Sequence, residues 1–348
     1  MDNDQLAIDN LENLYSGIRP DVSHVYVVPS IPAVSKQNPY LQLFYKPIEN
    51  STTVRLSSTS RLSPAILWKR FRGEKNIVHH HWFECHHLPS LLNMIYKVVL
   101  LSCYRLLGGK LVWTVHNVSP HHKRYRIANR LLRRVFSRLA NKLHVHCASA
   151  VGIVAAHFAV SPEMFSVIPH PLYPVRKIEQ QEARRQLIKR FPQLRGRSRP
   201  IVLMQGYLAA YKGVLQALAL LQKEQIDLTL IVAGPAKRYE TQYVNSIRTL
   251  SDQDERIILL EGFLEQADLD LLFNSVDYVL LNYQRILHSG GAVLAESYGK
   301  QIIAPRMGCL QELDEKAHQL FSSEAELMQI LKTIASQPSV SEANNNAS

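Results

Sequence analysis

The segment from Ile286 to Pro305 has the residue types and spacing of a phosphate-binding site. We expect a helix to begin at Ser289, with Gly290 and Gly291 in its first turn and Glu296 farther along it. Amide groups at a helix N-terminus are free donors at its positive end, and they suit a phosphate group. A carboxylate farther along the same helix can accept hydrogen bonds from ribose hydroxyls. The segment therefore predicts a site for a nucleoside diphosphate.

A second glycine-containing loop, from Gln205 to Gly213, predicts the other half of this site. Gly206 ends an expected strand and lets the backbone approach a ligand closely, and Lys212 at the next helix start can place a charge on a diphosphate. Taken alone, Lys212 is better explained as a surface lysine. The same geometry recurs before Ser289, and this recurrence favours the binding site.

The run H-H-H-W-F-E from His79 to Glu84 predicts a polar strand end. His79 and His81 share one face of the expected strand, and Glu84 lies just past its end, where a carboxylate can act as a general base. A metal site that also uses Cys85 is the alternative. Contiguous histidines cannot all reach one ion, and no spaced partner pair matches a zinc pattern. We therefore expect no metal and no other cofactor.

The run from Trp113 to His121 predicts a second strand that ends in polar residues, His116 and Asn117. His116 can hydrogen-bond a sugar hydroxyl or move a proton near neutral pH. A single motif of this kind is better explained as a capped, satisfied histidine. Two such ends on neighbouring strands favour a shared site.

Apolar runs and turn residues predict strands and helices that alternate along the chain, as in open parallel sheets. Ligands bind at the carboxyl ends of such strands, where the motifs above fall. The sequence therefore predicts an α/β fold with two Rossmann-like, doubly wound domains facing across a cleft. The predicted division is an N-terminal extension over 1–22, a first domain over 23–178, a linker over 179–199, a second domain over 200–335 and a disordered tail over 336–348.

Composition and charge narrow the class of protein and its partners. The chain is 46% hydrophobic and 20% charged, as is ordinary for a soluble globular protein, and its net charge of +11 favours anionic partners. Basic and apolar residues interleave at helical spacing over 125–140, which predicts a helix able to lie on an anionic membrane surface. A solvated helix face over a core stripe is the alternative. The acidic N-terminus has no apolar segment of a secretory signal, so we expect a cytoplasmic protein.

The longest apolar run, from Leu91 to Leu107, is interrupted by Lys97 and Arg105. It lies between two expected strands, so a crossover helix of a βαβ unit explains it better than a membrane span.

The order and spacing of these motifs resemble the GT-B class of glycosyltransferases, which have two Rossmann-like domains and use nucleotide sugars. More narrowly, the chain resembles the β-mannosyltransferases of xanthan-type exopolysaccharide assembly. The resemblance spans about residues 25 to 310 and is carried by Asn38-Pro39-Tyr40, His79, His81, Trp82, Glu84, His116-Asn117, Pro120-His121, Tyr211-Lys212-Gly213, Tyr283 and His288-Ser289-Gly290.

The resemblance implies that the C-terminal domain binds the nucleotide sugar. It implies that the N-terminal domain binds a lipid-linked or polysaccharide acceptor at the inner face of the cell membrane, with GDP-mannose as the donor. Two departures bear on stereochemistry. Retaining families have Glu at both ends of an E-x7-E motif, whereas His288 stands at the first end here; those families also often have Arg where this chain has Tyr207. Both departures favour inversion.

The expected reaction is an inverting, metal-independent glycosyl transfer. Glu84 is the first choice for the general base and His116 the second. The donor and its diphosphate are assigned to Gly206, Lys212, His288, Ser289, Gly290, Gly291 and Glu296. The acceptor is assigned to Asn38, Tyr40, His81, Trp82 and Asn117.

Two alternatives remain open on the sequence. One is a nucleotide-sugar 2-epimerase of the same fold, which would need no acceptor. The other is a non-catalytic, basic protein that binds membrane or RNA. No nucleic-acid motif such as an aromatic-rich RNP run occurs, so we expect no nucleic-acid partner.

Overall fold

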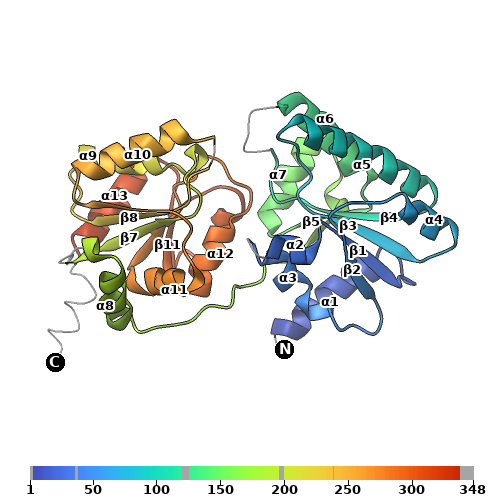
Figure 1. Cartoon of the computed structure of the whole chain (residues 1–348), viewed down its shortest axis with the longest axis horizontal. Helices are drawn as coiled ribbons and strands as arrows, with labels where there is room; N and C mark the ends of the chain where they lie inside the picture. Colours follow the sequence, from blue (N-terminus) through green and yellow to red (C-terminus); the bar gives the residue numbers. More distant parts are fainter. Residues whose placement is uncertain (1–2, 36–37, 120–124, 196–199, 238, 338–348) are drawn as a thin grey trace. The chain divides into compact units, whose positions relative to one another are not determined.

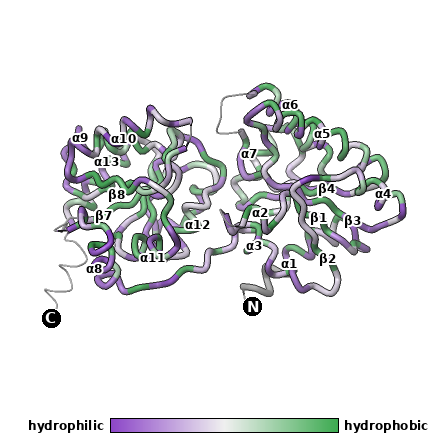
Figure 2. The backbone as a smooth tube through the Cα atoms, in the orientation of Figure 1, coloured by the Kyte–Doolittle hydropathy of each residue, from purple (hydrophilic) through white to green (hydrophobic). Residues whose placement is uncertain are grey.

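The computed structural model describes residues 3–35, 38–119, 125–195, 200–237 and 239–337. The chain forms two compact units, Met1–Pro171 and Leu172–Ser348, which we call unit 1 and unit 2 (Figure 1). Each unit has hydrophobic strands at its centre (Figure 2). Each is described by itself below.

Unit 1 contains a parallel sheet in the order β2-β1-β3-β4-β5-β6. Most of its strands are buried, as expected for a sheet that helices cover on both faces. The chain moves outward in opposite directions from β1 and β3, so the switch point where a ligand site is expected lies between their carboxyl ends. The strands are β1 (His24–Val28), β2 (Arg55–Ser58), β3 (Asn76–His80), β4 (Lys110–Thr114), β5 (Lys142–Val145) and β6 (Phe165–Val167).

Two layers of helices cover this sheet (Figure 1). The fourth, fifth and sixth helices lie together on one face, where neighbouring members contact each other. The first three lie on the other. The helices of unit 1 are α1 (Asn3–Ser16), α2 (Ile31–Ser35), α3 (Tyr40–Tyr45), α4 (Ala65–Phe71), α5 (Leu88–Leu106), α6 (Arg126–Leu139) and α7 (Ala148–Phe158).

Helix α1 belongs to the core of unit 1, whereas the sequence placed 1–22 outside the domain. Leu11, Leu14 and Tyr15 are buried against the β1 side of the sheet. They lie three and four residues apart, so they form one apolar stripe of a helix. Burial of this stripe makes α1 part of the domain.

Unit 2 contains a parallel sheet in the order β12-β11-β10-β7-β8-β9. Separate apolar clusters cover its two faces, and its switch point lies between β7 and β10. The strands are β7 (Ile201–Gln205), β8 (Thr229–Gly234), β9 (Ile257–Glu261), β10 (Tyr278–Leu280), β11 (Gln301–Pro305) and β12 (Gln319–Phe321). The helices are α8 (Gln180–Arg190), α9 (Val214–Lys223), α10 (Thr241–Gln253), α11 (Gln266–Ser275), α12 (Gly290–Ser297) and α13 (Glu324–Ala335).

Helix α8 packs on α11 within unit 2, although the sequence assigned 179–199 to a linker. The Arg184 guanidinium lies 2.8 Å from both carboxylate oxygens of Asp277, and Leu187 is buried. The compact units therefore divide between Pro171 and Leu172, seven residues before the predicted end of the first domain at 178. The two sheets themselves confirm the predicted pair of doubly wound α/β domains.

Candidate active site

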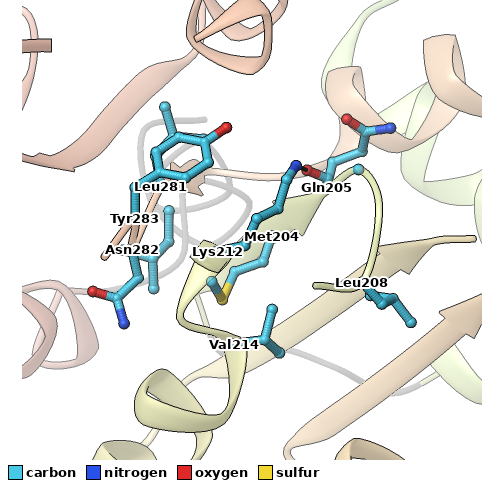
Figure 3. Close-up of a pocket in the computed structure, with 10 residues that line it drawn as sticks. Met204, Gln205, Leu208, Lys212, Val214, Leu281, Asn282 and Tyr283 are labelled. Atoms are coloured by element: carbon cyan, nitrogen blue, oxygen red, sulfur yellow. Dashed lines mark hydrogen bonds between the residues drawn. The ribbon is translucent and has the colours of Figure 1, made fainter. Parts of the chain in front are cut away.

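A pocket lies at the switch point of unit 2, where the carboxyl ends of β7 and β10 meet (Figure 3). The first glycine-containing loop of the sequence, from Gln205 to Gly213, contributes to its lining. The residues that line it are Met204, Gln205, Gly206, Leu208, Lys212, Val214, Leu280, Leu281, Asn282 and Tyr283.

Close contact between backbone segments explains why glycines occur around this pocket. Gly213 has a φ of +67°, and a Cβ there would lie 2.1 Å from the carbonyl oxygen of Asn282. The Asn282 side-chain amide donates to the Gly213 carbonyl at 2.9 Å. Gly206 has a φ of +113°, which disfavours residues with a side chain. The loops after β7 and β10 therefore hold each other in place.

Lys212 lies along the wall of the pocket (Figure 3). Its ammonium group donates to the Gln205 carbonyl at 2.9 Å and lies 5.7 Å from the centre of the Tyr283 ring. An ammonium group has three donors, and this is its single hydrogen bond within the described residues, so it has capacity for anionic oxygens. The arrangement can hold a phosphate group next to the backbone of the loop.

The N-terminus of α12 is linked to this pocket by a hydrogen bond. The Ser289 hydroxyl lies 2.9 Å from the Tyr283 hydroxyl and also accepts from the Ala292 amide at 3.1 Å. Ser289 is therefore a buried N-cap. Within the described residues, the amides of Gly290 and Gly291 donate to no acceptor. They are therefore the donors at the N-terminus of α12 that an anion can use.

The remaining predicted donor residues lie on the same segment. His288 is half-buried and immediately precedes the N-cap. Glu296 is exposed on α12 and does not line the pocket. The pocket and the hydrogen bond at Ser289 thus connect Gly206 and Lys212 with the helix end, and the donor-binding roles of all these residues, His288 and Glu296 included, stay predictions.

In unit 1, Trp82 marks the end of β3. Its φ is +44°, a left-handed conformation that is a clear outlier for a bulky residue. The indole stacks on the His116 ring, with centroids 4.7 Å apart and planes 13° apart. Tyr40 meets the same His116 ring edge-on at 5.0 Å. Backbone strain maintained by its surroundings is common at functional sites. The strand ends after β3 and β4 are therefore brought together, as the sequence predicted.

Glu84 lines a small cavity next to His116, Asn117 and Arg133. Arg133 is only 4% exposed, and its guanidinium donates to the Asn117 carbonyl and lies 5.3 Å from the Trp113 ring centre. Burial lowers the pKa of Arg133 to about 10, while the negative charge of Glu84 opposes that shift. Its Nε and Nη1 atoms have no hydrogen-bond partner among the described residues. Arg133 thus places a buried positive charge beside the proposed base.

The sequence did not single out Arg133, because it lies within a helix whose other arginines are exposed. The signal that could have revealed Arg133 is its position on the buried face of α6. Asn38, predicted to contact the acceptor, is exposed, and its side-chain oxygen accepts from the Tyr40 amide at 3.0 Å. Pro120 and His121 lie outside the described residues.

The described residues contain no group of three or more His, Cys, Asp or Glu side chains arranged to hold a metal ion. A tyrosine hydroxyl contacts two of the predicted histidines. Tyr45 lies 2.7 Å from Nδ1 of His79 and 2.9 Å from Nε2 of His81.

Two curated proteins from Xanthomonas campestris pv. campestris are similar to this chain in sequence. Each is a GDP-mannose:glycolipid 4-beta-D-mannosyltransferase, and each is 26% identical, over 278 and 279 residues, which is 77% of this chain and 70% of the relative. No protein-family model matches the chain.

Solved structures share the fold at low sequence identity. Anabaena Alr3699/HepE in complex with UDP and glucose has a TM-score of 0.61 and 15% identity, over 91% of this chain and 90% of that one. A glycosyltransferase from Rickettsia africae has a TM-score of 0.57 and 13% identity, over 90% and 88%. These likenesses confirm the predicted GT-B fold.

The sequence relatives confirm two further predictions. The chain resembles the xanthan-type mannosyltransferases, and its enzyme class is that of a glycosyltransferase.

Proposed function

We propose that this chain transfers mannose from GDP-mannose, with inversion, to a hydroxyl group of a lipid-linked glycan acceptor. The observation that carries the proposal is the pocket of unit 2, where Lys212 offers a donor to a diphosphate and Tyr283 hydrogen-bonds the N-cap of α12, whose first amides are further donors. The choice of mannose, GDP and a glycolipid is supported by the names of the two sequence relatives. The proposed pathway is exopolysaccharide biosynthesis.

In the proposed reaction, unit 2 binds the donor and unit 1 supplies the acceptor site and the base. Glu84 takes the proton of the acceptor hydroxyl, whose oxygen bonds to the anomeric carbon as the bond from that carbon to the diphosphate breaks. Lys212 and the amides of Gly290 and Gly291 meet the charge that develops on the departing GDP. No step requires a metal ion.

A transfer assay with GDP-mannose and a lipid-linked oligosaccharide tests the proposal. We expect mannose in the glycolipid only when enzyme, donor and acceptor are all present, with the β-anomer as product. Conversion of the nucleotide sugar to an isomer without acceptor would instead favour the 2-epimerase. An α-linked product would contradict inversion.

An exposed surface of apolar and basic residues in unit 1 supports the proposal of a lipid-linked acceptor. Helix α6 exposes Ile127, Leu131 and Val135 between Arg126, Arg130, Arg134 and Arg138, so apolar and cationic groups alternate along one face. Its neighbour α5 exposes a stripe of its own, with Leu88, Leu92, Ile95, Val99 and Leu106 at helical spacing. Figure 2 shows hydrophobic segments along both helices.

This surface extends to α4, where Trp68 and Phe71 are exposed beside Lys69 and Arg70. Helices α4, α5 and α6 together carry no Asp or Glu. Exposed apolar side chains on helices whose charged residues are all cationic match the interface of an anionic bilayer. None of the helices in the described ranges is long and apolar enough to cross a membrane. We therefore propose that unit 1 docks peripherally on the inner face of the cell membrane.

Vesicle sedimentation tests this docking. We expect the chain to bind phosphatidylcholine vesicles containing phosphatidylglycerol and to bind pure phosphatidylcholine much less. Because a buried leucine contributes roughly 1.5–3 kcal/mol, the double variant Leu92→Ser, Leu131→Ser should weaken binding by more than about tenfold. Ile153→Ser, which changes an exposed residue of α7, is the control and should bind as the parent does. Equal binding by both variants would contradict the proposed surface.

A further inference from the structure

A chain of hydrogen bonds runs through the sheet of unit 1 behind His116. It starts at the Ile168 carbonyl, which lies 3.0 Å from Nε2 of His144. Nδ1 of His144 lies 2.9 Å from the Thr114 hydroxyl, which lies 2.8 Å from Nε2 of His79. These side chains are buried, so every proton along the chain needs a defined acceptor.

The direction of the first bonds follows from the carbonyl, which can only accept. Nε2 of His144 must therefore carry the proton, and burial, which lowers the pKa of His144 to about 4, keeps its Nδ1 bare near neutral pH. The Thr114 hydroxyl must donate to that Nδ1, so it accepts from Nε2 of His79. Burial also holds the pKa of His79 far below its usual value. Nδ1 of His79 is thus a bare acceptor.

Two tyrosine hydroxyls compete for this single acceptor. Tyr15 and Tyr45 each lie 2.7 Å from Nδ1 of His79. Burial raises the pKa of both phenols, so both stay protonated and can donate. Nδ1 has one lone pair, so only one of the two hydroxyls can use it fully. Only Tyr45 also reaches His81, at 2.9 Å from Nε2.

The Tyr45 hydroxyl can donate to His79 or to His81, and the two directions lead to different tautomers of His116. Nε2 of His116 lies 3.3 Å from Nδ1 of His81. If Tyr45 donates to His79, its oxygen accepts from Nε2 of His81, and Nδ1 of His81 accepts from Nε2 of His116. Nδ1 of His116 then carries no proton, and this is called the bare state below. Tyr45 also hydrogen-bonds the Tyr15 hydroxyl. If Tyr15 donates to His79 and Tyr45 donates to His81 rather than to Tyr15, His81 donates to His116, and Nδ1 of His116 carries the proton.

We propose that Tyr45 is a positioning residue whose hydroxyl, acting through His81, sets which ring nitrogen of His116 carries the proton. The two states differ only in hydroxyl orientation and proton positions, so the packed rings need not move. In the bare state, Nδ1 of His116 can accept a hydrogen bond from a sugar hydroxyl, and in the other state it donates one. This consequence for activity rests on the proposed function, whereas the tautomer itself does not.

Two matched variants are expected to favour opposite tautomers of His116. In Tyr15→Phe, Tyr45 is the only donor left for His79, so Nε2 of His116 should carry the proton. In Tyr45→Phe, Nε2 of His81 has lost its partner; an orphaned acceptor is more readily tolerated than an orphaned N–H, so His81 should donate to His116. Nδ1 of His116 should then carry the proton. Both variants keep the ring and remove one hydroxyl.

Long-range ¹H–¹⁵N correlation spectra of histidine-labelled protein measure these tautomers, with the His116 signals assigned by comparison with His116→Gln. We expect the Nε2–H form in Tyr15→Phe and the Nδ1–H form in Tyr45→Phe. Circular dichroism would verify folding, and the Tyr15→Phe result stands alone if Tyr45→Phe does not fold. The same tautomer in both folded variants, or the Nδ1–H form in Tyr15→Phe, would overturn the proposal even if transfer activity is absent.

Activity provides a separate readout for positioning. If His116 must accept a hydrogen bond from the acceptor hydroxyl, Tyr15→Phe should keep kcat/KM for the acceptor, and Tyr45→Phe should lower it about tenfold with KM for the donor unchanged. Equal losses in both variants would assign the tyrosines a purely structural role and contradict this consequence.

Discussion

Glu84→Gln is expected to lower turnover by about 10²–10⁴-fold, the usual contribution of a general base, while donor affinity stays unchanged. Glutamine keeps the size and one carbonyl oxygen of the side chain but cannot take a proton from the acceptor. The cavity that Glu84 shares with His116 and Arg133 is retained, since neither partner is altered. Donor affinity should survive because the predicted donor residues lie in unit 2.

Steady-state kinetics and nucleotide titration together check this prediction. Glu163→Gln, an exposed carboxylate of the same unit, is the matched control and should behave as the parent. Activity of Glu84→Gln near the parent level would rule out Glu84 as the base. A collapse in His116→Gln alone would then transfer that role to His116, the second candidate.

Mild acid is expected to destabilise unit 1, because its sheet buries neutral histidines. Burial holds the pKa values of His79, His80 and His81 well below the usual range and lowers that of His144 to about 4. Below a pH of about 6.5 the unfolded chain takes up protons at these rings, whereas the folded unit does not. Stability is thus complete above that pH and falls as the pH drops toward the folded-state values.

The expected loss of stability is large because the contributions of the four rings add up. Each contributes about 1 kcal/mol between pH 6.5 and 5.5, so the melting temperature of unit 1 should fall by roughly 10 °C over that interval. Scanning calorimetry at several pH values measures the effect.

His80 provides a matched variant for the acid transition. It lies on the opposite face of β3 from His79, with Nε2 3.2 Å from the Lys97 ammonium and Nδ1 without a hydrogen-bond partner in the described chain. His80→Gln keeps an acceptor for Lys97 but cannot be protonated, so it should flatten the pH dependence by about a fifth, because burial also lowers the pKa of His170 in unit 1 to about 4. His86→Gln, at an exposed position, should leave it as in the parent. A melting temperature independent of pH from 7 to 5 would contradict this explanation.

The sequence predicted the positions of most strands because buried parallel strands are continuous apolar runs that end in polar residues. His81, Trp82 and His116 were found in this way, and the structure brings them together. The segment L-H-V-H from Leu143 to His146 has the same alternation as the run at His79, and it could have revealed the buried ring of His144.

Other parts of the site depend on contacts that no local pattern contains. Tyr15 reaches His79 across 64 positions of sequence, and Tyr45 reaches His81 across 36. Tyr15 lies in the segment that the sequence assigned to an N-terminal extension. Arg133 looked like its neighbours in a basic helix, and only the packing of α6 on the sheet shows that it is buried.

Isothermal titration of the whole chain with GDP tests most directly the central claim, that Lys212 and the end of α12 hold a nucleoside diphosphate. We expect one molecule of GDP to bind the parent, and Lys212→Met to bind at least about tenfold more weakly, since a hydrogen bond to a charged group contributes roughly 1.5–3 kcal/mol. Lys223→Met, at the exposed end of α9, should bind as the parent does. No heat of binding with GDP, UDP or ADP would contradict the account.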